Sequence, residues 1–384
     1  MVSSLENQAF DTQIISIRKK NQIESSWIVF TTSGRSEGFT GTLRAGYKLF
    51  IKEILVRWNK VNIGGEYMDI RYLLLLQDFR NGVGSVFETF FLKMSYLGEM
   101  NVVLTIMAAI YWCVSKEYGT YLLMGWSGCR VVNGLLKVAA CVYRPWIRDP
   151  RVVPNKTALT EATGYSFPSG HSMNGAALYG GGAIRKEFNS ILRAAFFIMI
   201  VLIAFSRNYL GVHTPQDVIV GVLAGMPVML GTLKLMKWLE AHPKKDIQVM
   251  CFGILIAVIV AVFAAVKEYP VDYDAAGNLL VDGAKMAGDT FKGAGWCMGF
   301  LTGWVLERRI IGFSTDVTMI TRVTRLMPGI LLHYAISLIL VPIIKHGIPG
   351  AGGILISCFL QTFYVSFVFP FCMKYLVVAR EQNS

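Results

Sequence analysis

The stretch DIQVMCFGILIAVIVAVFAAV, residues 246–266, decides the class of fold. Its length matches the ~20 apolar residues that an α-helix needs to cross the hydrocarbon core of a bilayer. The rest of the chain agrees: of 384 residues, 54% are apolar and only 16% are charged, and the mean hydropathy is +0.48. Soluble domains carry about 25% charged residues. The sequence therefore predicts an integral membrane protein.

Further apolar runs predict a multi-pass bundle. We expect about nine membrane-spanning helices, at residues 99–115, 119–143, 169–184, 191–208, 215–233, 246–266, 291–306, 327–344 and 351–373. The run at 169–184 is short and rich in glycine, which predicts close packing against its neighbours. The expected fold class is all-α, a polytopic membrane helix bundle.

The first residues fit this pattern poorly. Residues 1–67 are basic and hold no sustained apolar core, so no signal peptide is predicted. Residues 43–61 have apolar side chains at helical spacing with lysines and arginines between them, which is typical of a helix on a membrane surface. The alternative, which we favour, is that the natural chain begins at Met68. Residues 72–97 are apolar but broken by charges, which predicts an interfacial or partly inserted helix.

The net charge of +12 suits membrane loops better than nucleic-acid binding, because the cations cluster between apolar runs. The clusters are Arg185, Lys186 and Arg193; Lys234, Lys237, Lys244 and Lys245; and Arg308, Arg309, Arg322 and Arg325. Cytoplasmic loops carry such an excess, so loops 144–168, 207–214 and 267–290 are predicted to lie on the other, extracytoplasmic side. We expect a plasma-membrane protein that contacts the bilayer and binds no nucleic acid.

Seven cysteines lie in or beside apolar runs, and none has zinc-ligand spacing with another cysteine or a histidine. They are expected to be small buried side chains, with no disulfide framework and no metal site.

Two cationic residues lie within or at the end of an apolar run, where burying a charge costs free energy. Lys137 lies inside an apolar run and Arg144 closes it, seven residues further on. On one helix these side chains would share a face, and Pro145 would stop the helix. A cation inside a span is costly unless it is paired or faces a wet cavity. Both residues are therefore candidates for function.

Two further blocks carry polar groups suited to phosphate chemistry. In Pro168-Ser169-Gly170-His171, the proline suits the first turn of a helix, and free N–H groups, the Ser169 hydroxyl and the bare Gly170 backbone would form an anion site. The other block is Ser206-Arg207, followed by His213 and Asp217. His213 and Asp217 are spaced to share a helix face, so the carboxylate could orient the imidazole for nucleophilic attack.

Together the three blocks resemble the signature of the type 2 phosphatidic acid phosphatase (PAP2) superfamily in order, spacing and residue type. The resemblance covers roughly residues 70–235. It divides the chain into a basic extension (1–67), an interfacial helix (68–98), a PAP2-like catalytic bundle (99–235) and additional transmembrane helices (236–384).

The resemblance also implies roles. His213 would attack phosphorus and become a phosphohistidine, Asp217 would orient it, and His171 would protonate the leaving oxygen and then activate water. The phosphoryl oxygens would be held by Lys137, Arg144, Ser169, Gly170 and Arg207. No metal and no other cofactor is implied.

The expected substrate is a phosphorylated membrane lipid, a monoester or a diphosphate. A glucose-6-phosphatase-like enzyme or a phosphoryl transferase of the same superfamily remains an alternative. A haloperoxidase is disfavoured by the apolar runs, and a lipid carrier or channel with a relic site by the complete signature. Arg130 has no role in the signature; it either extends the polar cavity or bonds backbone carbonyls.

Overall fold

The computed structural model describes residues 62–63, 66–274 and 276–374, which belong to one compact unit, residues 51–384. The expected surface helix at 43–61 lies outside the described residues. The described part is a helix bundle, as predicted, apart from a hairpin of two-residue strands, β1 (Asn62–Ile63) and β2 (Glu66–Tyr67).

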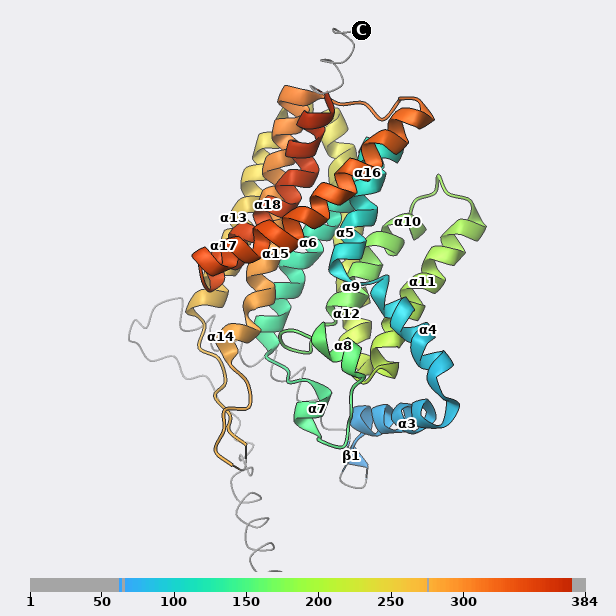
Figure 1. Ribbon diagram of the computed structural model, residues 1–384, viewed down its shortest axis with the longest axis vertical. Coiled ribbons are helices and arrows are strands. Elements are labelled where there is room, and N and C mark those ends of the chain that lie inside the picture. Colours follow the sequence, from blue (N-terminus) through green and yellow to red (C-terminus); the bar gives the residue numbers. More distant parts are fainter. Residues whose placement is uncertain (1–61, 64–65, 275, 375–384) are drawn as a thin grey trace, which may run out of the picture. The chain divides into compact units, whose positions relative to one another are not determined.

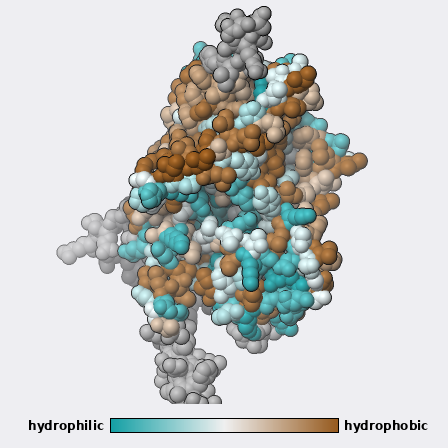
Figure 2. Space-filling model, viewed as in Figure 1, coloured by the Kyte–Doolittle hydropathy of each residue, from teal (hydrophilic) through white to brown (hydrophobic). Residues whose placement is uncertain are grey.

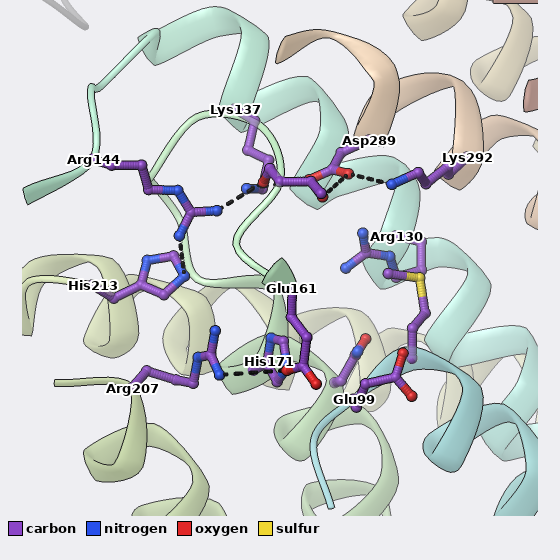
Figure 3. A pocket seen from close by; sticks show the side chains of 14 residues that line it. Glu99, Arg130, Lys137, Arg144, Glu161, His171, Arg207, His213, Asp289 and Lys292 are labelled. Carbon is purple, nitrogen blue, oxygen red and sulfur yellow. Dashed lines mark hydrogen bonds and ion pairs between the residues drawn. The ribbon is translucent and has the colours of Figure 1, made fainter. Parts of the chain in front are cut away.

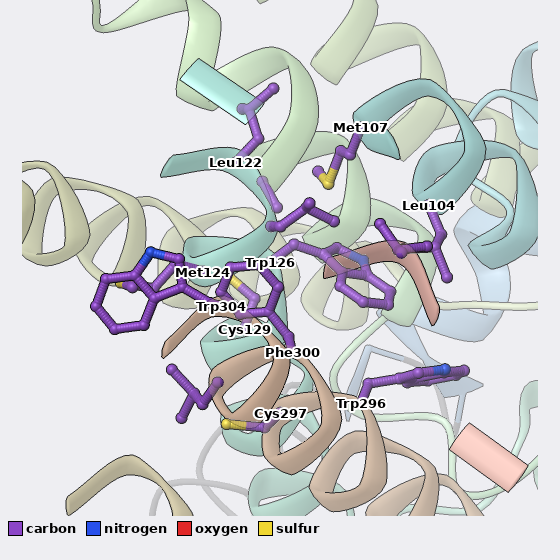
Figure 4. Close-up of a cluster of buried hydrophobic side chains, with 14 of the residues drawn as sticks. Leu104, Met107, Leu122, Met124, Trp126, Cys129, Trp296, Cys297, Phe300 and Trp304 are labelled. Atoms are coloured by element: carbon purple, nitrogen blue, oxygen red, sulfur yellow. The ribbon is translucent and has the colours of Figure 1, made fainter. Parts of the chain in front are cut away.

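Two long, mostly buried helices form the centre of the bundle, α6 (Lys116–Ala140) and α15 (Gly288–Leu306) (Figure 1). Helix α12 (Pro215–Ala241) packs on α6, and α13 (Asp246–Val266) and α18 (Ala351–Phe363) pack on α15. Buried aromatic side chains fill the space between α6 and α15; Trp126 and Trp296 lie with ring centroids 5.3 Å apart (Figure 4). This packing brings the amino end of α15 beside the carboxyl end of α6.

Glycines on α15 permit this close approach. A Cβ at Gly293 would stand 2.5 Å from the Arg130 carbonyl oxygen of α6, and a Cβ at Gly299 would stand 2.1 Å from the Phe359 carbonyl oxygen of α18. Small residues at such contacts are how helices in bilayers gain van der Waals packing. The backbone of α15 is therefore held directly between two neighbours.

Other helices surround this centre. The longer ones are α3 (Met68–Val83), α4 (Ser85–Tyr96), α5 (Met100–Ala109), α11 (Ser190–Tyr209) and α16 (Met319–Ala335). The short ones are α7 (Pro145–Arg148), α8 (Lys156–Thr160), α9 (Gly170–Gly175), α10 (Gly181–Ala183), α14 (Gly283–Met286) and α17 (Val341–Gly347). Single helical turns complete them: η1 (Ile110–Val114), η2 (Ala176–Gly180), η3 (Pro243–Lys245), η4 (Glu307–Ile311), η5 (Ile336–Leu340) and η6 (Tyr364–Val368).

The segment expected to be one interfacial helix, 68–98, is instead two helices. The chain breaks at Gly84, whose φ of 79° lies in the region that glycine adopts without steric cost. After α4 the chain bends by 55° into α5 and η1, so these elements together resemble a broken span or a re-entrant loop.

Of the helices described, five are long and apolar enough to cross a bilayer, or six if the bent pair of α4 with α5 counts as one span. They include α11, α12, α13, the α16–α17 segment and α18. The expected spans at 119–143, 169–184 and 291–306 do not meet these limits of length and composition, so fewer than the nine expected spans qualify on those grounds. Helices α6 and α15 carry charged side chains, and most of their residues are buried by other helices. Figure 2 shows apolar side chains along α16 and α17, and polar ones around α7 and α8.

The two ends of the bundle differ in charge. At one end the start of α6 meets the end of α15, where Lys116 Nζ lies 2.6 Å from Glu307 Oε1, and Arg309 pairs with Asp246 nearby in α13. At the other end α6 finishes, α12 and α15 begin, and the loops 141–168 and 210–214 gather. The candidate residues therefore lie at the end away from the basic clusters at 244–245 and 308–309.

Candidate active site

A cavity of about 200 Å³ lies at this second end, between α5, α6, α9, α11 and α15 (Figure 3). Six of the eight site residues expected from the sequence line it: Lys137, Arg144, Gly170, His171, Arg207 and His213. The other two, Ser169 and Asp217, are buried behind that lining. Segments that are far apart in the sequence thus meet around one polar space.

Lys137 and Arg144 line the cavity from two different elements, which the sequence did not predict. Helix α6 ends at Ala140, because Cys141 adopts a left-handed conformation with φ of 51°. Residues 141–144 are not helical, and Arg144 is instead the residue before α7. The two cations therefore do not share a helix face. Pro145 begins the next short helix instead of stopping α6.

Arg144 is held rigidly. Its Nε donates to Gly164 O (3.1 Å), Nη2 to Thr163 O (2.7 Å) and Nη1 to Val212 O (3.0 Å), and Nη1 also lies 2.9 Å from His213 Nε2. A guanidinium can only donate. Nε2 of His213 must therefore be the unprotonated nitrogen, with its lone pair towards the cavity.

The other nitrogen of His213 faces a carboxylate. Nδ1 lies 3.3 Å from Asp217 Oδ2, which also accepts hydrogen bonds from Ser166 Oγ (2.6 Å) and from Thr214 N (2.9 Å). The contact predicted between His213 and Asp217 is present. Its geometry differs from the expectation, because His213 lies in the loop before α12 and Thr214 caps that helix in a reciprocal pair with Asp217.

The electrostatic surroundings of His213 oppose its protonation. Burial and the neighbouring Arg144 cation hold the pKa of His213 well below its ordinary value. Burial also lowers the pKa of Arg144 to about 10, which still leaves the guanidinium charged at neutral pH. The site thus holds a neutral imidazole beside a fixed cation.

Ser169 does not occupy the position expected of it. It is the residue before α9, and its hydroxyl accepts hydrogen bonds from Ser172 N (3.3 Å) and Ser172 Oγ (2.9 Å). Its backbone N–H donates to Asp217 O (2.8 Å), so the start of α9 is attached to the start of α12. Pro168 precedes this cap and is not in the first helical turn. Gly170 and His171 face the cavity, whereas Ser169 supports them from behind.

His171 has an acidic partner that sequence reasoning missed. Its Nε2 lies 3.3 Å from Oε2 of Glu161, which follows α8, and Arg207 Nη1 lies 3.9 Å from the same oxygen. Burial raises the pKa of Glu161, and the Arg207 cation opposes that rise. Arg207 also donates from Nη1 to Ser95 Oγ of α4. Nothing in the sequence indicated this contact, because Glu161 is a single acidic residue in a loop.

A second missed carboxylate comes from α15. Asp289 was expected in an outer loop, but it lies in the first turn of α15, where its Oδ2 is 3.4 Å from Lys137 Nζ and its Oδ1 is 3.0 Å from Lys292 Nζ. It also accepts from Thr163 Oγ1 (3.1 Å). Asp289 and Arg130 line the same cavity, so a carboxylate from another helix lies near this buried cation. The sequence did contain a signal for this contact, because an acid and a base, Asp289 and Lys292, stand at the start of an apolar run.

The cavity as a whole is cationic. Among the described residues, five cationic and three acidic side chains line it, a formal balance of +2 with neutral histidines. The cations are Arg130, Lys137, Arg144, Arg207 and Lys292, and the acids are Glu99, Glu161 and Asp289. Within the part of the chain that the structure describes, no three histidine, cysteine or acidic side chains gather into a group that could hold a metal ion.

Two family models match the chain. The family model of the PAP2 superfamily matches residues 118–241, and that of the PAP2 superfamily phosphatase transmembrane extension matches residues 291–381. The chain belongs to the PAP2 superfamily. The PAP2 match runs from α6 to α12 and includes all eight predicted site residues, so the resemblance seen in the sequence is confirmed.

Three curated PAP2 relatives are lipid phosphatases by name. The chain is 29% identical over 194 residues to a probable sphingosine-1-phosphate phosphatase of Dictyostelium discoideum, covering 46% of each chain. It is 32% identical over 116 residues to phosphatidylglycerophosphatase B of Bacillus subtilis (strain 168), covering 28% of this chain and 53% of the relative. It is 24% identical over 184 residues to lipid phosphate phosphatase delta of Arabidopsis thaliana, covering 45% and 42%. The chain thus spans about half the length of the curated relatives it matches. No solved structure matches it significantly.

Proposed function

We propose that this PAP2 protein is a phosphatase that hydrolyses a phosphate ester of a membrane lipid through a phosphohistidine on His213, without a metal ion. The observation that carries the proposal is the arrangement around His213. Asp217 lies at Nδ1, and Nε2 faces a cationic cavity beside Arg144. A neutral imidazole oriented by a carboxylate is the form that acts as a nucleophile.

The charge of the cavity suits a phosphate group. Its formal balance of +2 matches a phosphate dianion, and the charge that develops on the phosphoryl oxygens in the transition state would meet fixed guanidinium and ammonium groups. In the structure Arg144 donates to the lone pair of His213. When a phosphoryl group binds, Arg144 would donate to its oxygens instead, which frees Nε2 to attack.

The reaction would proceed in two displacements. Nε2 of His213 forms a bond to phosphorus, the bond from phosphorus to the ester oxygen breaks, and the oxygen keeps the electron pair. It takes a proton from His171, which enters the reaction as the imidazolium beside Glu161. A water molecule then gives its proton to His171 and its oxygen to phosphorus, while the bond from phosphorus to Nε2 breaks. Inorganic phosphate leaves, and both histidines return to their starting states.

A lipid substrate is favoured by the surroundings of the site. An apolar pocket of about 450 Å³ adjoins the cavity and shares Glu161 with it; Leu92, Leu97 and Ala158 are among its lining residues. A hydrocarbon chain in that pocket would leave the phosphate headgroup within the cationic cavity. The names of the relatives agree with this choice. We also propose that the site faces the extracytoplasmic side of the plasma membrane, since the basic clusters lie at the opposite end.

The test is phosphate release from lipid phosphates, prenyl diphosphates and glucose 6-phosphate by protein purified in detergent with EDTA. Activity on the lipids should survive EDTA and be lost in His213→Ala. The matched control is His242→Ala, an exposed histidine at the far end of α12, which should keep wild-type activity. Activity that disappears with EDTA or persists in His213→Ala would overturn the mechanism. Preference for the sugar phosphate would favour the glucose-6-phosphatase-like alternative.

A further inference from the structure

Arg130 is a buried cation without a role in the PAP2 signature. Its side chain is 1% exposed and lines the cavity, and its Nε and Nη1 have no hydrogen-bond partner among the described residues. Nη1 lies 3.2 Å from where a Cβ on Gly170 would stand, so the guanidinium reaches the first turn of α9, which carries His171. Neither nitrogen bonds a backbone carbonyl in the described part of the chain. The geometry therefore favours the hypothesis that Arg130 extends the polar cavity over the hypothesis that it bonds backbone carbonyls.

A second guanidinium in the cavity is also incompletely paired. Arg207 has no partner for Nε and Nη2 among the described residues. The two arginines lie apart in Figure 3: Arg207 near His171 and His213, and Arg130 on the opposite side, near Lys292 and Asp289. Buried cations without hydrogen-bond partners cost several kcal/mol. Two such groups at separate places are best satisfied by two anionic groups.

Helix α15 of the transmembrane extension builds the Arg130 side of the cavity. Asp289 pairs with both Lys292 and Lys137, and the ring of Trp296 lies 5.6 Å from the guanidinium carbon of Arg130. The other acid on this side, Glu99, is already engaged, since its carboxylate accepts from Asn101 N (2.9 Å) and Val102 N (3.2 Å) at the start of α5. Arg130 thus remains available for an anion.

We propose that Arg130 and Lys292, supported by Asp289 and Trp296, form a second anion subsite that binds the inner phosphate of a lipid diphosphate. The proposal rests on the proposed function and narrows its substrate class. His213 would form a bond to the terminal phosphorus, the bond from that phosphorus to the bridging oxygen would break, and the electron pair would stay on the inner phosphate. Arg130 and Lys292 would hold that negative charge, and the product would be a lipid monophosphate.

The kinetic test compares farnesyl diphosphate with farnesyl monophosphate, which share one hydrocarbon chain. The measured quantity is the ratio of kcat/KM for the diphosphate to that for the monophosphate. Because a hydrogen bond to a charged group contributes about 1.5–3 kcal/mol, this ratio should fall about 10- to 100-fold in Arg130→Gln and in Lys292→Gln. It should not change in Lys285→Gln, which removes an exposed lysine of α14. An equal loss on both substrates in Arg130→Gln would overturn the proposal.

A binding test keeps the result interpretable if a variant loses activity. Inorganic pyrophosphate should raise the melting temperature of the wild type at lower concentration than inorganic phosphate does, and Arg130→Gln should lose that preference. His213→Ala should keep it. If no lipid phosphate is hydrolysed but this preference depends on Arg130, the proposed function fails and the subsite stands. If both lipids are hydrolysed and pyrophosphate is not preferred, the subsite fails and the function stands.

Discussion

The guanidinium of Arg144 lies 2.9 Å from Nε2 of His213, and because it can only donate, it identifies Nε2 as the unprotonated nitrogen, which carries the lone pair. This one contact assigns the imidazole tautomer and places a fixed cation at the atom that would attack phosphorus. It joins a residue before α7 to a residue before α12.

Replacing Arg144 with glutamine should change the pH dependence of the reaction. Arg144 and burial hold the pKa of His213 well below its ordinary value, so the ring stays neutral as the pH falls. Without the cation that pKa rises, and the loss of kcat/KM on the acid side should begin at higher pH. At neutral pH the loss should be about 100-fold, as for removal of one donor to a transition-state oxyanion. A pH–rate profile of unchanged shape would contradict this role.

Asp217 and Ser166 should act through His213. Asp217→Asn removes the carboxylate that fixes Nδ1–H, and kcat should fall about 10⁴-fold, as for the equivalent change in a serine-protease triad. Ser166→Ala removes the 2.6 Å bond to Asp217, and because such a bond contributes about 1 kcal/mol, kcat should fall about 5-fold. Single-turnover kinetics measure both. In a His213→Ala background, Ser166→Ala should cause no further loss of the residual rate; a further loss would show that Ser166 acts elsewhere.

Asp289→Asn should strengthen the binding of phosphate while it slows turnover. The change removes the partner of Lys137 and Lys292, so the formal charge of the cavity rises to +3. Phosphate should therefore inhibit more strongly, while kcat falls about 10-fold because Lys137 is no longer positioned. The melting temperature should also fall, since breaking a buried ion pair costs about 3–5 kcal/mol. Weaker inhibition by phosphate, with kcat unchanged, would contradict this assignment.

Gly299→Ala should destabilise the bundle from a position remote from the cavity. The added Cβ would stand 2.1 Å from the Phe359 carbonyl oxygen, so α15 and α18 would have to separate. Overpacking of this kind costs about 1–3 kcal/mol, which a melting curve in detergent will detect. The matched control is Gly231→Ala on α12, where an added Cβ meets nothing within 4 Å. Equal melting temperatures for the two variants would show that α15 is not closely packed there.

The sequence by itself determined the membrane class, the PAP2 signature and six of the residues that line the cavity. These follow from local properties: the lengths of apolar runs, the cost of charge within them, and the spacing of the three blocks. A segment such as 246–266 has to be a helix in a bilayer wherever its neighbours lie.

Only the tertiary structure decided how these residues meet. The end of α6 at Cys141 moved Arg144 off the helix face of Lys137, and the cap at Thr214 put His213 outside α12. Packing of α15 on α6 brought Asp289 and Lys292 to Lys137 across more than 140 residues of chain. The physical reason is that burial and ion pairing depend on which side chains lie next to one another. The contacts between helices determine those neighbours, and no single segment of the sequence encodes these contacts.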